Sequence, residues 1–308
     1  PIYFSEVSSN VNEVERSFKL HCSSKLKDFV YKYEHLFGKE IWNVLDESIQ
    51  GDPGAFLSAI NTYASRKGNL RIYLLIDEYD NFTNTILSTY GTEFYRKATH
   101  GEGFIRGFFN VIKSATTGTG AALERLFITG VSPVTMDDVT SGFNIGTNIT
   151  NDSWFNDLVG FSENELREML EYYKEQGVLQ ESIDEIVAMM KPNYDNYCFS
   201  EDTLEQCMFN SDMALYFLKS FVLHHKKPKE IVDPNIRTDF NKLAYLIKLD
   251  HGLGENFSVI KEIAEQGEII TDIVTHFSAL EMTDPSNFKS LLFYFGLLSI
   301  KGVDIDRK

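Results

Sequence analysis

Two adjacent carboxylates, Asp77 and Glu78, follow a near-continuous apolar run at residues 70–76. Such a run is typical of a strand that is buried on both faces of a parallel sheet. The carboxyl end of that strand is where open α/β folds bind their ligands. One carboxylate placed there can hold Mg²⁺, usually through its water ligands, and the next can orient or deprotonate an attacking water. The alternative is an ordinary strand end followed by an acidic turn.

A second short apolar run, residues 125–131, contains Thr129 and leads into Ser132 and Pro133. In P-loop NTPases, a polar residue on the strand next to the acidic strand helps to position the water against the γ-phosphate, and Thr129 would be that group. The alternative is a β-turn of small residues, in which Gly130 and Pro133 serve geometry only.

The phosphate-binding loop that should accompany these residues, GxxxxGK[ST] between a strand and a helix, is absent from the sequence. Gly38-Lys39-Glu40 lacks the upstream glycine and the hydroxyl residue, residues 101–107 contain no lysine, and residues 118–120 read as a loop. Without the backbone N–H groups and the lysine of that motif, a triphosphate has no cradle. The sequence therefore predicts the acidic half of a nucleotide site without its phosphate-binding half.

The hydrophobic periodicity predicts two domains. Residues 1–160 are expected to form an α/β domain with a parallel sheet. Its strands are predicted at residues 2–7, 70–76, 125–131 and 143–150, and its helices at 11–37, 41–49, 54–67, 84–89 and 103–116. Residues 161–308 are expected to be mainly α-helical, with helices at 163–176, 181–190, 211–225, 236–248, 259–265 and 286–293. Ser162 and Glu165 have the spacing of a capping box at the start of the first of these helices.

Composition excludes several classes of protein. Of the 308 residues, 43% are hydrophobic, which is enough to bury a sizeable core, and the formal net charge of −16 repels nucleic-acid phosphates and anionic lipid. The three cysteines, Cys22, Cys198 and Cys207, form neither a CxxC pair nor a zinc framework, which favours a reduced, cytoplasmic compartment. No apolar run is long enough to span a membrane, and no signal peptide opens the sequence.

Many specific strings in order give the chain a resemblance to a known family. They lie at residues 75–81, 97–104, 127–134, 141–145, 160–165, 194–199, 210–213 and 233–237. Together they resemble the bacterial predicted AAA-ATPase-like family. The stretch Tyr194-Asp195-Asn196-Tyr197, which reads as a turn, departs from the family's usual Tyr-Asp-Gly-Tyr and puts a glycine-specific backbone conformation there in doubt.

The resemblance implies a partial P-loop fold of the AAA or STAND type followed by a helical domain, for which a winged helix is one candidate. Full-length members are expected to begin with a P-loop segment, commonly Arg-Arg-Phe-Gly-Lys-Ser, and many carry a PD-(D/E)XK nuclease-like domain. It also implies ATP and Mg²⁺ as cofactors, with Asp77 as the Mg²⁺ ligand, Glu78 as the group that activates water and Thr129 as a sensor.

Three arginines are weaker candidates for contact with phosphate. Arg106 and Arg125 are candidate arginine fingers by charge and neighbourhood, and Arg237 could reach phosphate from the helical domain or form a surface salt bridge. Partners expected for such a protein are a nucleotide, a second copy of the chain, or a nuclease-like domain.

Both ends of the sequence are expected to be cut from a longer polypeptide, because it opens on Pro1 directly before a predicted strand and closes shortly after the apolar residues 291–300. In the P-loop fold, the phosphate-binding strand would lie beside the strand that contains Phe127. We therefore expect an open sheet edge there, and an ATPase that is inactive as this chain. The alternative is a non-catalytic interaction module that keeps the ATPase fold.

Overall fold

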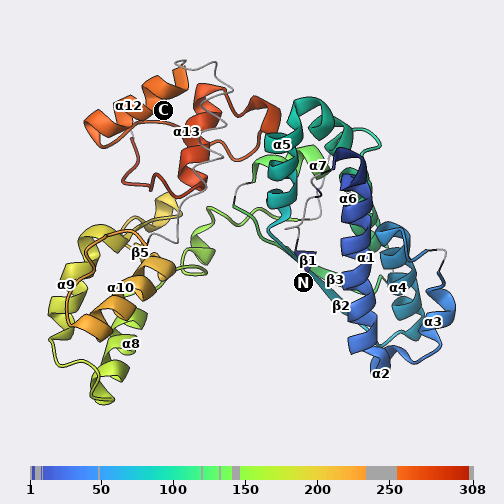
Figure 1. The fold of residues 1–308 in the computed structure, drawn as a ribbon, viewed down its shortest axis with the longest axis horizontal. Helices are drawn as coiled ribbons and strands as arrows, with labels where there is room; N and C mark the ends of the chain where they lie inside the picture. Colours follow the sequence, from blue (N-terminus) through green and yellow to red (C-terminus); the bar gives the residue numbers. More distant parts are fainter. Residues whose placement is uncertain are drawn as a thin grey trace. The chain divides into compact units, whose positions relative to one another are not determined.

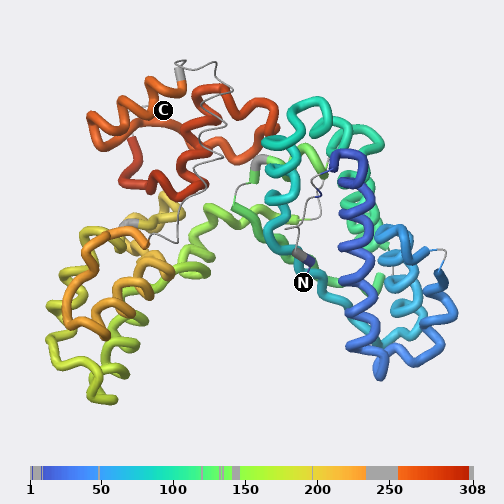
Figure 2. Tube along the Cα trace, in the orientation of Figure 1, coloured from blue at the N-terminus to red at the C-terminus, as the bar shows by residue number. Residues whose placement is uncertain are grey.

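A computed structural model describes residues 2–3, 8, 10–47, 49–118, 121–131, 133–140, 146–233 and 255–304. By their contacts, the described residues divide into two units (Figures 1 and 2). Unit 1 takes the residues up to 147 together with 255–265 and 271–291, and unit 2 takes 148–233, 266–270 and 292–304. The predicted division into domains at residue 160 stays a prediction.

A parallel sheet lies at the centre of unit 1. Its strands are β1 (Ile2–Tyr3), β2 (Ile72–Asp77) and β3 (Leu123–Ile128), in the order β1-β2-β3. Tyr3 lies opposite Asp77, and Leu75 lies opposite Phe127. The sequence therefore predicted the α/β class and the parallel pairing correctly. Among the described strands, β3 is at the edge of the sheet, so the open edge expected beside Phe127 is present.

Among the described residues, helices cover one face of this sheet and leave apolar side chains exposed on the other. Along β2, Ile72, Leu74 and Ile76 are buried, whereas Tyr73 and Leu75 are 60% and 46% exposed. Phe127, opposite Leu75, is 44% exposed. The prediction that this strand is buried on both faces is wrong for the described residues: the apolar run supplies two apolar faces, but helices cover one of them.

The helices of unit 1 build its core. The longer ones are α1 (Val14–Lys32), α4 (Pro53–Lys67), α5 (Tyr79–Thr99) and α6 (Phe104–Thr117), accompanied by the short η1 (Val11–Glu13), α2 (Glu34–Phe37), α3 (Ile41–Val44) and α7 (Val134–Thr140). Helix α4 packs against both α1 and α6 (Figure 1). Four phenylalanines meet in this core: the ring of Phe18 lies 5.2 Å from that of Phe82, 5.3 Å from that of Phe104 and 5.8 Å from that of Phe108.

Several predicted boundaries in unit 1 differ from the structure. Helix α5 extends far beyond the predicted 84–89, with an interruption at Gly91 (φ 79°, ψ −178°), a left-handed conformation that glycine tolerates. Helix α3 ends at Val44, not at residue 49. Of the predicted strand 143–150, residues 146–150 are not a strand and the remainder lies outside the described residues. Residues 4–7 of the first predicted strand also lie outside the described residues.

Unit 2 contains a helical core and a small hairpin. Its helices are α8 (Glu163–Glu175), α9 (Ile183–Tyr194) and α10 (Ser211–His224), and α9 contacts both antiparallel strands, β4 (Asp195–Tyr197) and β5 (Met208–Phe209). Two short helices, η2 (Ser153–Phe155) and η3 (Glu201–Thr203), lie in the connections. The capping box of Ser162 and Glu165 is present as predicted. The turn predicted at residues 194–197 is wrong, because Tyr194 ends α9 and the next three residues form β4.

The C-terminal segments contain α12 (Glu255–Gln266), η4 (Ala279–Glu281) and α13 (Pro285–Tyr294). The helices predicted at 259–265 and 286–293 lie within α12 and α13. The helix predicted at 236–248 lies outside the described residues. Within the described part of the chain, we find no helix with the length and apolar character that a membrane span needs.

Candidate nucleotide site at the ends of two parallel strands

Asp77 and Thr129 meet at the carboxyl ends of β2 and β3. The hydroxyl of Thr129 donates a hydrogen bond to Oδ1 of Asp77. The backbone N–H of Thr129 also donates to the carbonyl of Ile76, at 2.9 Å, so the strand pairing continues to this point. Asp77 is only half-buried. The structure thus brings together two of the three residues expected at the site. Among the described residues, Oδ2 of Asp77 has no hydrogen-bond partner.

Glu78 stands at the junction of β2 and α5. Its backbone is left-handed (φ 52°, ψ 42°), a conformation that non-glycine residues rarely adopt. Its side chain is exposed, and Oε2 accepts a hydrogen bond of 3.3 Å from the side-chain amide of Asn81. A strained residue at a strand end is a feature that clusters at functional sites. The left-handed conformation of Glu78 lets α5 begin directly after β2, and it keeps the Glu78 carboxylate in solvent next to Asp77 in the sequence.

Tyr79 and Asp80 hold the loop that leaves β3. The N–H of Tyr79 donates to the carbonyl of Thr129 at 3.1 Å. The carboxylate of Asp80, fully buried, accepts from the N–H of Val131 at 3.1 Å through Oδ1 and from the side-chain amide of Asn84 at 3.1 Å through Oδ2. Burial first, and then the Asp80 charge, raises the pKa of Tyr79 well above its ordinary value. The position of Thr129 therefore depends on the first turn of α5.

Gly130 permits this close approach. A Cβ at this position would lie 2.5 Å from Cε1 of Tyr79 and 2.7 Å from Oδ1 of Asp80. Both distances are shorter than carbon contacts allow. The glycine is therefore required by its packing against Tyr79 and Asp80, and this requirement coexists with the hydrogen bond of Thr129.

The carboxylates at the strand ends fit Mg²⁺ only if the phosphates of a nucleotide supply further ligands to the ion. No group of three or more His, Cys, Asp or Glu side chains in the described ranges could hold a metal ion on its own. Asp80 accepts from Val131 and Asn84, which leaves Asp77 as the half-buried carboxylate at the strand end, beside the exposed Glu78. Mg²⁺ is commonly bound by one or two carboxylates together with waters and substrate phosphates. Asp77 suits that mode.

Of the three candidate arginines, Arg106 and Arg125 lie within the described residues. Arg125 lies on β3, four residues before Thr129, a separation of roughly 13 Å along a strand. Its guanidinium lies 6.0 Å from the ring centroid of Tyr73 on the exposed face of the sheet. Arg106 is half-buried in the first turn of α6. Arg237 lies outside the described residues. Their roles stay predictions.

A cavity of about 800 Å³ lies elsewhere in unit 1. It is lined by α1, by the first turns of α4 and α6, and by the end of α5, including Lys19, Lys97 and His100. Asp77, Glu78 and Thr129 are not among its lining residues. The strand-end residues are therefore separate from this cavity.

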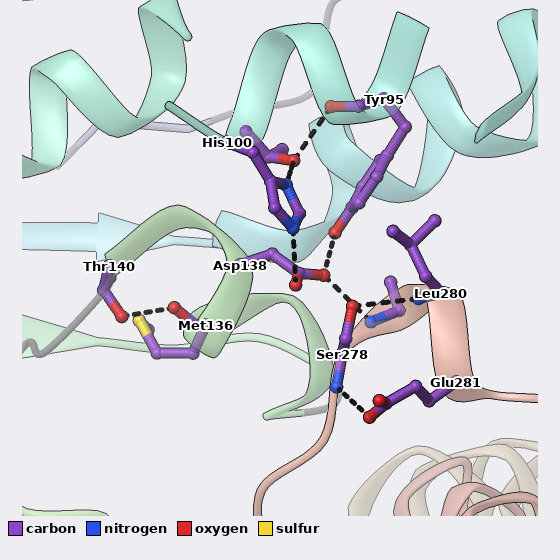
Figure 3. Close-up of polar contacts among 10 residues, drawn as sticks. Tyr95, His100, Met136, Asp138, Thr140, Ser278, Leu280 and Glu281 are labelled. Atoms are coloured by element: carbon purple, nitrogen blue, oxygen red, sulfur yellow. Dashed lines mark hydrogen bonds and ion pairs between the residues drawn. The ribbon is translucent and has the colours of Figure 1, made fainter. Parts of the chain in front are cut away.

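A buried carboxylate that the sequence did not single out, Asp138 of α7, organises a second polar cluster (Figure 3). Its Oδ2 accepts from the hydroxyl of Tyr95 at 2.7 Å and from the N–H of Ala279 at 2.9 Å. Its Oδ1 lies 3.6 Å from Nε2 of His100, whose Nδ1 lies 2.9 Å from the hydroxyl of Thr99. Burial first, and then the Asp138 charge, raises the pKa of Tyr95 strongly.

Neither Asp80 nor Asp138 carried a sequence signal of this role. Each is an acidic residue in a short polar stretch, and an exposed acid near a helix N-terminus looks the same in a sequence. The partner of Asp138, Ala279, is 141 residues away. Asp80 lies in one of the strings that carry the family resemblance, and His100, the neighbour of Asp138, lies in another.

Comparison with known proteins agrees with that resemblance. Residues 1–140 match a family model described as "Predicted AAA-ATPase". The chain matched no curated protein and no solved structure. The matched segment contains the whole β1-β2-β3 sheet together with Asp77, Glu78 and Thr129. Residues 1–140 are therefore similar to the AAA-ATPase-like family, and the match covers less than half of the 308 residues.

Proposed function

We propose that unit 1 carries the hydrolytic half of an ATPase site at the carboxyl ends of β2 and β3. The observation that carries the proposal is the hydrogen bond from Thr129 to Asp77, with Glu78 as the next residue. Asp77 would be the Mg²⁺ ligand, Glu78 the group that orients or deprotonates water, and Thr129 the γ-phosphate sensor. Mg²⁺, when bound with ATP, would neutralise charge on the transferred phosphoryl group.

Each residue has a physical reason for its role. The donated hydrogen bond fixes one oxygen of Asp77 and leaves the other for an ion or its water. Glu78 is exposed, so a water can reach its carboxylate. The N–H of Thr129 donates to Ile76, and its carbonyl accepts from the N–H of Tyr79. A shift of Thr129 on phosphate binding would therefore move Tyr79 at the start of α5.

The phosphate-binding half is proposed to come from a segment that these 308 residues do not contain. Two observations support this inference. The sequence has no GxxxxGK[ST] motif, and the parallel sheet has an apolar face exposed at Tyr73, Leu75 and Phe127 beside the edge strand β3. Parallel sheets are normally covered on both faces. A strand and helix that carry the phosphate loop would pair with β3 and cover that face.

The same proposal identifies the partners. The missing segment belongs either to a longer form of this polypeptide or to a second copy of it, and a nuclease-like domain is the fusion partner that the family resemblance suggests. ATP is the ligand. The net charge of −16 opposes non-specific binding to nucleic acid by this chain alone. A reducing, cytoplasmic setting agrees with the three free cysteines.

The test compares residues 1–308 with a longer polypeptide that includes a phosphate-binding loop. Calorimetry with Mg-ATP and a phosphate-release assay should give turnover only for the longer form. Glu78→Gln should retain ATP binding and lower kcat by about 10²–10⁴-fold, the contribution typical of a general base. Glu93→Gln, the same change at an exposed position of α5, should leave kcat unchanged.

Two results would count against the proposal. Unchanged turnover in the Glu78→Gln enzyme would remove Glu78 from the mechanism. A longer polypeptide that binds no Mg-ATP would favour the alternative, a non-catalytic interaction module that keeps the fold.

A further inference from the structure

Cys198 and Cys207 occupy matching positions on the hairpin of unit 2. Cys198 directly follows β4 and Cys207 directly precedes β5. In the antiparallel register of these strands, Tyr197 lies opposite Met208. The ladder ends at this pair and its register is irregular between Asp195 and Tyr197, so Cys198 and Cys207 lie one step beyond the last paired positions. Residues paired in an antiparallel ladder have Cβ atoms about 4.5–5.5 Å apart, and a disulfide needs about 3.5–4.5 Å, so a local adjustment of the loop would let the two thiols bond.

The two thiols face the same short loop, residues 199–206. The thiol of Cys198 donates to the carbonyl of Ser200 at 3.1 Å, with the carbonyl of Thr203 at 3.7 Å. The thiol of Cys207 donates to the carbonyl of Leu204 at 3.7 Å. The pKa of Cys207 is raised, by burial first and then by the neighbouring Cys198. Both thiols therefore donate into the same loop.

Asn156 holds the two sides of the hairpin together just beyond the cysteines. This side chain is 3% exposed. Its Nδ2 donates to the carbonyl of Gln206 at 2.9 Å, and its Oδ1 accepts from the N–H of Phe199 at 3.4 Å. Phe199 and Gln206 are the neighbours of the two cysteines. The N–H of Cys198 is also fixed, by the hydroxyl of Ser299 at 2.9 Å. The separation of Cys198 from Cys207 is thus set from both sides.

We propose that Cys198 and Cys207 are a redox pair that forms a reversible intramolecular disulfide across the end of the β4–β5 hairpin. Both thiols are free in this structure, which is the reduced form. The oxidant is a small disulfide, RSSR. This site is independent of the nucleotide chemistry proposed for unit 1.

The chemistry proceeds by two exchanges. Cys207 is half-buried whereas Cys198 is 1% exposed, so the thiolate of Cys207 attacks RSSR first. This forms a Cys207–SR mixed disulfide and releases RS⁻. The thiolate of Cys198 then attacks the sulfur of Cys207, forms the internal S–S bond and releases a second RS⁻. The two protein protons pass to the released thiolates, so the net change is two protein thiols and RSSR to one protein disulfide and two RSH.

The third cysteine is excluded by its surroundings. Cys22 is fully buried in α1 of unit 1, and burial raises its pKa to about 12. A thiol with so little thiolate and no access to solvent is inert. Oxidation should therefore stop after two thiols have been consumed.

The test exposes the intact 308-residue chain to excess oxidised glutathione and counts free thiols after denaturation. We expect the count to fall from three to one. Cleavage after glutamate separates the two cysteines, because Glu201 and Glu205 lie between them. The unreduced digest should therefore contain one linked pair of peptides, which separates when a reductant is added.

Single substitutions assign the steps. Cys22→Ser should still lose two thiols. Cys198→Ser should stop at a glutathione adduct on Cys207, and Cys207→Ser should keep both remaining thiols, since Cys198 is inaccessible. Amide hydrogen exchange of each reduced variant checks that unit 2 is folded. Retention of all three thiols by the folded wild-type chain, a linkage to Cys22, or a disulfide between two copies would each overturn the proposal.

Discussion

The hydroxyl of Thr129 donates a hydrogen bond to Oδ1 of Asp77, at the point where two parallel strands end side by side. The neighbouring backbone is paired as well, since the N–H of Thr129 donates to Ile76 and its carbonyl accepts from Tyr79. Asp77 is thus oriented by a residue whose own position is fixed by the sheet and by α5. This orientation supports the Mg²⁺ role proposed for Asp77, because a carboxylate that is already oriented does not have to be ordered when an ion binds.

Removal of this hydroxyl should destabilise unit 1. Thr129→Val keeps the side-chain shape but leaves Asp77 without its donor, and we expect the free energy of unfolding to fall by about 1–2 kcal/mol. Thr129→Ser keeps the hydroxyl and should lose less. Urea unfolding of the two variants measures the difference. Equal stabilities for the valine and serine chains would show that the hydrogen bond contributes nothing.

The adjacency of Asp77 and Thr129 could be predicted from sequence because it follows from a general rule. Two apolar runs that form parallel strands must end at the same edge of the sheet, so the polar residues that follow them become neighbours. The α8 capping box was predictable for a similar reason: Ser162 and Glu165 interact over a single turn of helix. Local spacing determines such contacts.

Contacts between distant segments could not be predicted in this way. Asp138 binds the N–H of Ala279, and no pattern within α7 indicates a partner 141 residues later. The exposed sheet face was missed for another reason. Tyr73 and Leu75 are as apolar as the buried residues that alternate with them, so the sequence alone cannot show which face the helices cover. Asn196, in Asp195-Asn196-Tyr197, was read as part of a turn, but it continues the chain from α9 into β4.

Because the backbone of Glu78 is left-handed, we expect glycine to be more stable than alanine at this position, the reverse of their order within a helix. At φ 52° a Cβ is unfavourable by about 1–2 kcal/mol, so Glu78→Gly should be more stable than Glu78→Ala by about 1 kcal/mol. At Glu93, in the exposed helical part of α5, the glycine variant should be the less stable one by a similar amount. Thermal or urea unfolding of the four variants gives the sign of the stability difference between glycine and alanine at each position. The same sign at both positions would contradict the strained conformation of Glu78.

Gly130 should tolerate no side chain. In Gly130→Ala the new Cβ would collide with the ring of Tyr79 and with Oδ1 of Asp80, both buried, so the loop after β3 must move. We expect a loss of about 1–3 kcal/mol in the free energy of unfolding. Gly107→Ala is the control: nothing lies within 4 Å of a Cβ there, on the exposed side of α6. That variant should gain up to about 1 kcal/mol from helix propensity. A neutral Gly130→Ala would show that Tyr79 is not packed against this glycine.

The contribution of Tyr95 to the free energy of unfolding should decrease at alkaline pH. Burial and the Asp138 charge raise its pKa in the folded chain above the ordinary 10.0, so the folded state keeps a proton that the unfolded state loses. Below pH 10 both states are protonated and the contribution of Tyr95 to stability is complete. Above pH 10 that contribution declines, by up to about 1.4 kcal/mol for each pH unit.

Tyr95→Phe isolates this effect. It removes the hydroxyl that donates to Asp138, and at pH 7 we expect it to cost about 1–3 kcal/mol, because one donor to a buried carboxylate is lost. It also removes the titrating proton, whereas Tyr79 remains in both chains. The stability curves of wild type and variant, measured by urea unfolding from pH 7 to 11, should therefore converge above pH 10. Parallel curves across this range would mean that the phenol of Tyr95 ionises as easily in the folded chain as in the unfolded one.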